Sequence, residues 1–82
     1  GDRTVYPDLL EQHSSLQRSQ LITRLRKCSS TPYAMKSQYK TGEVIDHSAF
    51  GLGLVLNSET DRINVIFPEI DGHRTLIQNY AE

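Results

Sequence analysis

The β-branched apolar residues of this chain are gathered in its second half. Val and Ile together occur twice in residues 1–41 and eight times in residues 42–82. Because their χ1 rotamers are already restricted, these residues favour the pleated surface of a sheet. The first half is instead rich in Leu, Gln, Arg and Ser. The division predicts helices in residues 1–41 and a sheet in residues 42–82.

Two short helices are expected in the first half instead of a single long one. On one straight helix the leucine and isoleucine side chains of this half would spread over too wide a stripe to face one core. A break near Ser14-Ser15 removes the conflict, and Ser14 and Gln17 have the spacing of a capping box. We therefore predict a second helix over about residues 16–27.

Residues 28–41 are expected to form a linker or irregular arm. A proline disfavours helical geometry at the residue before it, so Pro32 ends the helical region. Tyr33, Met35 and Tyr39 are available to pin this arm to the rest of the protein.

A β-meander is predicted from Gly42 onward. Ile63, Val65 and Phe67 alternate with other residues, which is the period-two pattern of a half-buried strand. Four short strands with no second sheet to pack against must curl to bury one face, which favours a small barrel. The predicted strands are Val44–Ile45, Leu52–Leu56, Arg62–Phe67 and Arg74–Gln78.

Glycines mark the expected bends of this sheet. Gly51 and Gly53 flank Leu52 at the start of a strand, where a missing Cβ fits a bulge or a sharp bend. Asp71-Gly72 is a turn signal between the last two strands. A phosphate-binding loop would need further glycines and a following helix, which the sequence lacks.

Length and cysteine content narrow the class of protein. A chain of 82 residues forms one small domain at most. No apolar run approaches the roughly 18 residues of a membrane span, and no charged segment precedes a hydrophobic one as in a secretion signal. The single cysteine, Cys28, cannot form an internal disulfide. These features predict a cytoplasmic protein without membrane partners.

The net charge of −1 results from segments of opposite sign. Residues 43–82 carry two arginines against seven acidic residues, a sum of −5. Residues 18–42 carry six basic residues and no acid, a sum of +6, and residues 1–17 sum to −2. This asymmetry bears on partners, because a basic segment attracts phosphates and an acidic one attracts basic surfaces. The six basic residues are Arg18, Arg24, Arg26, Lys27, Lys36 and Lys40.

The second half resembles a known small barrel. The motifs that carry the resemblance are Gly42–His47, Phe50–Gly53 with Val55, Ile63–Phe67 and Gly72–Leu76. They are similar to the Tudor-like, SH3-type module at the C-terminus of UvrD/PcrA helicases and, more loosely, to the RNA-polymerase-interacting domain of CarD-type regulators. The resemblance covers residues 40–81, and residues 1–39 have no counterpart.

Together with the composition, the resemblance implies a fold and a function. The fold would be mainly β, with a helical arm and basic linker in residues 1–41. Residues 42–82 would form a Tudor-like/SH3-like barrel of four to five antiparallel strands, able to fold alone. The function would be non-catalytic docking on a protein of the transcription or DNA-repair machinery, such as RNA polymerase, through an exposed strand and nearby loops. No helicase motor is present in this chain.

An acidic protein-binding site is predicted on the barrel. The charge of −5 in residues 43–82 opposes a grip on a phosphate backbone and suits a basic protein surface. Phe50, beside the glycine bend, is more typical of a core plug than of a wall in an aromatic cage for methylated lysine. The predicted protein-binding residues are Glu59, Asp61, Glu69, Asp71 and Phe50.

Nucleic acid binding by the basic arm is the alternative. The six basic residues of the arm could contact phosphates, and Tyr33 and Tyr39 could stack on bases. A solvated helix face, or an arm held by the acidic half of the chain, explains the same charges without a ligand.

The sequence contains no residue pattern typical of a catalytic site or a metal site. His13, His47 and His73 are the possible bases. Neighbours in a strand point to opposite sides, so Asp46 and Ser48 face away from His47. The histidine spacing fits no zinc signature. We therefore predict no catalytic residue, no metal and no cofactor.

Overall fold

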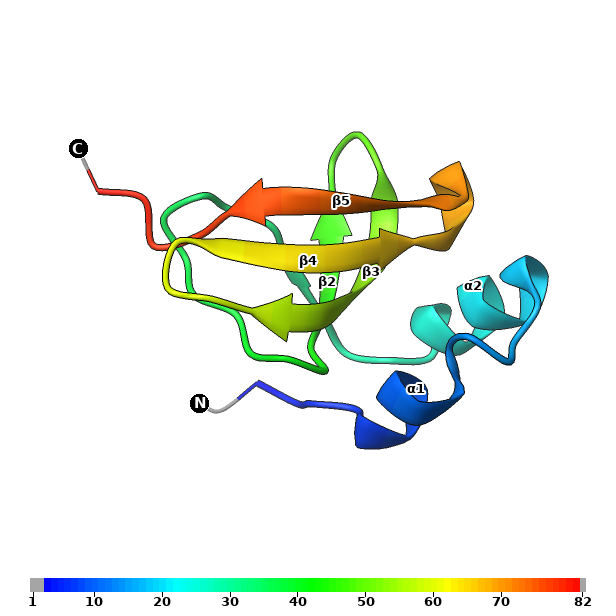
Figure 1. Ribbon diagram of the computed structural model, residues 1–82. Coiled ribbons are helices and arrows are strands. Elements are labelled where there is room, and N and C mark those ends of the chain that lie inside the picture. Colours follow the sequence, from blue (N-terminus) through cyan, green and yellow to red (C-terminus); the bar gives the residue numbers. More distant parts are fainter. Residues whose placement is uncertain (1–2, 82) are drawn as a thin grey trace.

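The computed structural model describes residues 3–81 and shows a mainly β protein with two short helices (Figure 1). None of the helices within these residues has the length and apolar run that a membrane crossing requires. The elements in chain order are α1 (Pro7–Gln12), α2 (Arg18–Arg26), β1 (Ser30–Pro32), β2 (Val44–His47), β3 (Gly51–Ser58), β4 (Arg62–Phe67), the 3-10 helix η1 (Pro68–Ile70) and β5 (Gly72–Ile77).

The strands form one open sheet in the order β1-β2-β3-β4-β5. Strands β2 to β5 pair antiparallel, which confirms the predicted meander, and β4 has the predicted bounds. The prediction of a linker over residues 28–41 is wrong at Ser30–Pro32, which pairs parallel with β2, so the sheet is mixed rather than antiparallel throughout. Three residues are too few to show the period-two alternation of a strand. They form a strand only because they pair with β2, which is distant in sequence.

The loop after β1 joins the two edge strands of the sheet. Tyr33 donates its hydroxyl hydrogen to the carbonyl oxygen of Ile77 in β5 at 2.7 Å. Tyr39 is buried, and its hydroxyl donates to the carbonyl oxygen of Pro32 in β1 at 2.8 Å. Of the three side chains predicted to pin the arm, Tyr33 and Tyr39 do so, whereas the Met35 side chain is exposed. Side chains and loop backbone therefore connect β1 to β5, without strand pairing.

Gly51 and Gly53 are required for different reasons. Gly51 opens β3 with a φ of +83°, a backbone conformation that favours glycine. At Gly53 a Cβ atom would lie 2.6 Å from a ring carbon of Phe67, so only glycine fits without displacing the ring. The bulge in β3 lies further along, at Leu56, where the register with β4 shifts.

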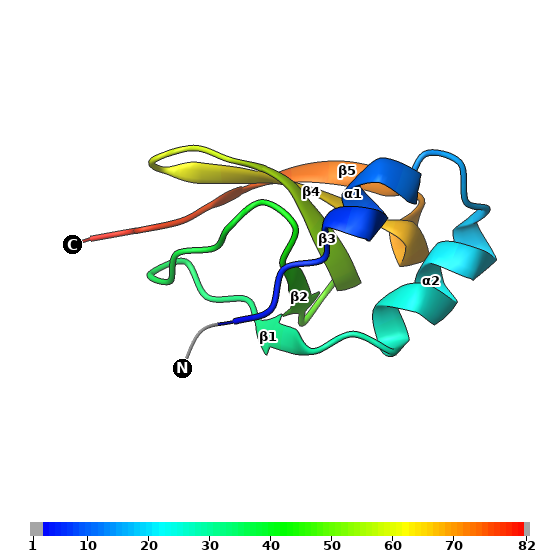
Figure 2. The same cartoon turned by 90° about the horizontal axis from the view of Figure 1, so that it is seen from below.

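The predicted break between two helices is confirmed, although the predicted cap is wrong. Ser14 and Ser15 lie in the turn between the helices. The cap is Gln17, whose amide donates to the Oε1 atom of Gln20 at 2.9 Å. Both helices pack against β3, and α2 also packs against η1 (Figure 2).

Two hydrophobic clusters lie on the two faces of the sheet, and the N-terminal arm contributes to both. The prediction that residues 42–82 fold as a domain of their own therefore stays a prediction. The loop-side cluster consists of buried Tyr39, Ile45, Val55, Ile63, Val65 and Phe67. The helix-side cluster consists of buried Leu9, Leu21, Leu25, Val44 and Leu54.

Candidate protein-binding surface around strand β5

The four predicted acidic residues lie at the two ends of the β4–β5 hairpin instead of in one patch. Glu59 and Asp61 belong to the turn between β3 and β4. Glu69 lies in η1 and Asp71 follows it, at the opposite end of β4. Gln78, just after β5, donates its amide to the carbonyl oxygen of Asp61 at 3.0 Å. Strand β5 therefore runs from one acidic pair to the other (Figure 1).

Two of these carboxylates are already bound within the chain. Glu69 Oε2 accepts the amide of Leu52 at 3.2 Å and so helps to hold the start of β3. Asp61 Oδ1 lies 3.0 Å from Arg62 Nε, and hydrogen bonding to this guanidinium holds the pKa of Asp61 below its usual value. All four residues are exposed, and the carboxylates of Glu59 and Asp71 have no hydrogen bond or ion pair within residues 3–81.

The outer edge of β5 carries backbone groups that no strand within residues 3–81 pairs with. In an antiparallel pair, hydrogen-bonded and non-hydrogen-bonded residue pairs alternate. The bond from the Gln78 amide to Asp61 fixes this alternation, so every second residue from Gly72 to Gln78 directs its amide toward β4. The residues of β5 whose amides face outward are His73, Thr75 and Ile77.

An exposed apolar group lies at the C-terminal end of β5. The carbonyl of Ile77 accepts the hydroxyl of Tyr33, as its outward direction requires, and the Ile77 side chain is 49% exposed. Three residues on, the amide of Tyr80 donates to the carbonyl oxygen of Met35 at 2.9 Å. Met35 and Tyr80 also have exposed side chains. The backbone bond brings Met35 and Tyr80 together, three residues from Ile77, so these exposed apolar side chains are candidates for contact with a partner.

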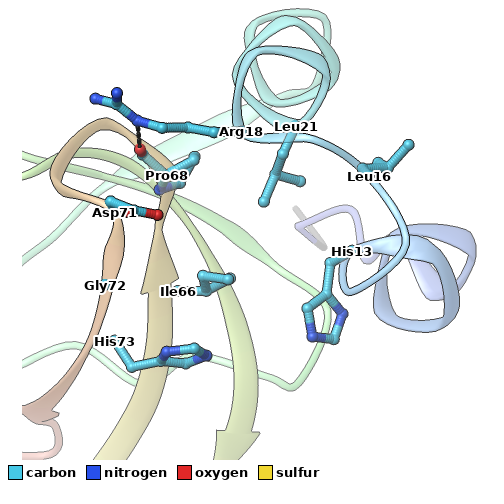
Figure 3. A pocket seen from close by; sticks show the side chains of 9 residues that line it. All are labelled: His13, Leu16, Arg18, Leu21, Ile66, Pro68, Asp71, Gly72 and His73. Atoms are coloured by element: carbon cyan, nitrogen blue, oxygen red, sulfur yellow. Dashed lines mark hydrogen bonds between the residues drawn. The ribbon is translucent and has the colours of Figure 1, made fainter.

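A pocket of about 150 Å³ lies beside the first residues of β5 (Figure 3). His13, from the turn after α1, and His73, from β5, lie on two sides of it, and Leu21 and Ile66 line the space between them. Ligand pockets usually measure about 300–1,000 Å³. This pocket is therefore of a size for one side chain of a partner rather than for a cofactor.

Phe50, predicted as a core plug or a protein-binding residue, belongs to a stack of rings. The ring centre of His47 lies 4.3 Å from that of Phe50 and 5.2 Å from that of Tyr33, with nearly parallel planes. His47 Nδ1 accepts the amides of Ala49 and Phe50 at 3.0 and 3.3 Å, which holds the β2–β3 turn. Rings stacked this closely leave no room for an ammonium group between them, so the stack does not have the form of an aromatic cage.

Arg18, one of the six basic residues predicted to contact nucleic acid, is used within the chain. Its Nε and Nη2 atoms donate to the carbonyl oxygens of Pro68 and Glu69 at 2.5 and 2.6 Å. These bonds join the start of α2 to η1. A guanidinium bound in this way has fewer donors left for a phosphate.

The other five basic residues fall into two groups. Arg24, Arg26 and Lys27 are exposed at the C-terminal end of α2. Lys36 and Lys40 lie in the loop between β1 and β2, which both views place away from α2 (Figures 1 and 2). The basic arm therefore does not present one continuous positive surface.

The single thiol is half-buried. Cys28 Sγ donates to the carbonyl oxygen of Arg24 at 3.3 Å. Burial raises the pKa of this thiol, and the hydrogen bond with Tyr6 offsets only part of that rise. A thiol with a raised pKa is a weak nucleophile at neutral pH. Among residues 3–81, no three His, Cys, Asp or Glu side chains come together as metal ligands do.

Sequence reasoning missed the apolar part of this surface. It assigned no binding role to Ile77, Tyr80 or Met35, and it did not bring His13 and His73 to one pocket. One signal was available, because the last strand of a meander has a neighbour on one side only. The pocket gave no signal, since it depends on how the helices pack on the sheet.

Comparisons with known proteins add no relative to this description. No protein-family model matches the chain, and neither the curated proteins nor the solved structures that were searched contain a match. The likeness of Gly42–Leu76 to Tudor-like modules stays a prediction from the residues themselves.

Proposed function

We propose that this chain is a non-catalytic protein-binding module that receives an extended segment of its partner along β5. The observation that carries the proposal is the outward row of amides at His73, Thr75 and Ile77. An added strand satisfies such groups through main-chain hydrogen bonds, whatever its own sequence. Neighbouring pockets and charges then select among partners.

The surroundings of β5 favour a segment with both apolar and basic side chains. His73 lies on the same face of the sheet as Ile66, because directly paired residues share a face. In an added strand, the residue that pairs with His73 has its side chain on this face. An apolar side chain there reaches the pocket of Figure 3. Glu59 and Asp71, at the two ends of β5, attract basic residues that flank it.

RNA polymerase is the partner that we propose first. The motifs between Gly42 and Leu76 resemble modules that dock on RNA polymerase through an exposed strand. On this interpretation the sheet is a Tudor-like, SH3-like barrel whose edge strands, β1 and β5, do not pair with each other. The sum of −5 over residues 43–82 suits a basic surface on the polymerase.

Two substitutions at Thr75 test strand addition. Thr75→Pro removes an outward amide and leaves the bonds to β4 in place, since proline is tolerated on an edge strand. Thr75→Val is the matched control, because it keeps the amide and removes the same hydroxyl bond to Asn64. With purified RNA polymerase core enzyme in isothermal titration calorimetry, we expect Thr75→Pro to weaken binding about tenfold, the net value of one to two hydrogen bonds. Thr75→Val should stay within about twofold of the unchanged protein.

Equal affinities of the two Thr75 variants would rule out strand addition.

Nucleic acid binding, the alternative function, is tested with the same purified protein. Binding of DNA or RNA with a salt slope of several units, without binding to the polymerase, would support nucleic acid recognition instead. In that case reversal of Arg24, Arg26 and Lys27 to Glu should abolish binding.

A further inference from the structure

Glu43 is a buried acidic residue at the start of the sheet. Its exposed fraction is 1%. Its Oε2 atom accepts the amide of Lys40, whereas no aligned hydrogen bond from residues 3–81 reaches its Oε1 atom. A buried carboxylate is costly unless a counter-charge and donors surround it. The site around Glu43 is therefore built for a cationic donor.

Arg3 supplies that cation from the N-terminal arm. Its Nε atom lies 3.0 Å from Glu43 Oε1. Its guanidinium carbon lies 4.8 Å from the centre of the Tyr39 ring, and its Nη2 atom donates to the carbonyl oxygen of Gln38. A carboxylate, an aromatic face and a carbonyl oxygen are three groups that a guanidinium binds well.

We propose that Glu43, Tyr39 and the Gln38 carbonyl form a binding site for an arginine side chain, which Arg3 occupies from within the chain and which an arginine of a partner chain can occupy in its place. The site selects arginine over lysine. A planar guanidinium can lie over the ring while its N–H groups reach the two oxygens, whereas an ammonium is a compact point charge.

The walls of this site are held without Arg3. The amide of Glu43 donates to the carbonyl oxygen of Lys40 at 3.1 Å, and the carbonyl of Glu43 accepts the amide of Val55 at 2.9 Å. The amide of Tyr39 donates to Gln78 Oε1 at 2.9 Å. These bonds belong to the loop and the sheet, so the site is already formed when the arginine side chain leaves.

Arg3 is joined to the rest of the fold through a short exposed segment. The Arg3 side chain is 37% exposed, and Thr4 and Val5 are exposed and outside regular structure. The arm is fixed at Tyr6, whose amide donates to the carbonyl oxygen of Gly42 at 2.8 Å. Because the short tether gives Arg3 a high effective concentration, a competing arginine needs further contacts from its own chain.

The experiment is the rescue of Arg3→Ala by a small guanidinium compound in the full chain. Without Arg3 the Glu43 carboxylate is buried and unpaired, so we expect the thermal midpoint to fall by at least about 5 °C. Methylguanidinium at about 20 mM should restore several degrees in a concentration-dependent manner, and methylammonium should restore none. If Arg3→Ala does not fold, the readout is recovery of the far-ultraviolet circular dichroism of the sheet on adding the same compound.

Matched proteins separate this site from general effects of the compound. The unchanged protein measures the effect of the salt itself. Arg3→Ala with Glu43→Gln lacks the carboxylate and should show no rescue. Arg18→Ala removes a guanidinium that binds the carbonyl oxygens of Pro68 and Glu69, and it should also gain nothing.

A short arginine peptide tests whether an arginine from another chain can occupy the site. Acetyl-Gly-Arg-Gly-amide should bind Arg3→Ala at least about tenfold more tightly than its lysine analogue. The proposal is overturned by equal binding of the two peptides, by no rescue of Arg3→Ala, or by equal rescue of Arg18→Ala.

Discussion

The two faces of the sheet are covered by different means. On the loop side, the cluster is built from the strands themselves and Tyr39, with the rings of Tyr33 and Phe50 packed against it. On the helix side, two strand residues meet leucines from α1 and α2. Rigid rings that pack against a glycine leave little freedom to adjust, whereas leucines on two short helices can shift.

Directional bonds accompany the rings on the loop side. Gln78 is buried, and its Oε1 atom accepts the amide of Tyr39 at 2.9 Å. Its Nε2 atom donates to Ser58 Oγ at 2.9 Å. These bonds tie β5, β3 and the loop together at fixed positions. The difference between the faces teaches that the loop side sets the shape of the sheet, while the helix side covers it.

Phe67→Ala should have the largest effect, because it empties the centre of the loop-side cluster. The ring of Phe67 lies edge-on to Phe50 at 5.3 Å between centroids and fills the space above Gly53. We expect the free energy of unfolding in urea to fall by about 4 kcal/mol. Phe67→Leu, which keeps most of the volume, should cost about half as much. A loss below about 2 kcal/mol for Phe67→Ala would contradict a rigid loop-side face.

Leu25→Ala tests the helix side with a smaller expected loss. Leu25 is fully buried against the sheet, but the short helix that carries it can settle into part of the cavity. We expect a loss of about 3 kcal/mol in urea denaturation. The control is Thr23→Ala on the same helix, which is exposed and should change stability by less than about 0.5 kcal/mol. A loss at Leu25 that exceeds the loss at Phe67 would reverse the comparison.

Gly53→Ala sharpens the comparison by adding one methyl group to the loop side. The new Cβ would lie 2.6 Å from carbons of both Phe67 and Val65, so the packing must open. We expect a loss of about 2 kcal/mol, which is typical of overpacking. At Gly72 the nearest atom is the flexible end of Arg74 at 3.1 Å, so Gly72→Ala should cost far less. Thermal and urea denaturation of the two variants measure the difference. Equal losses of stability would show that the loop-side packing can adjust to the added methyl group.

Local pattern was enough for the two helices and for strands β2 to β5, but not for β1 or η1. The alternation of Ile63, Val65 and Phe67 predicted β4 with its bounds, and the spread of leucines predicted two helices with a break. Binding residues were harder to predict. The prediction grouped Glu59 and Asp71 in one site by their charge, and charge carries no information on where residues lie in the fold. The structure places them at opposite ends of β5.

The sequence by itself determined the helical and β regions and the antiparallel meander, because these depend on rotamer preferences and on neighbours close in the chain. Only the tertiary structure decided the pairing of β1 with β2, the joining of the sheet edges by Tyr33, and the ion pair of Arg3 with Glu43. Each of these brings together segments far apart in sequence. These contacts are stabilised by burial and hydrogen bonds that exist only after the chain has folded, so no local sequence pattern predicts them.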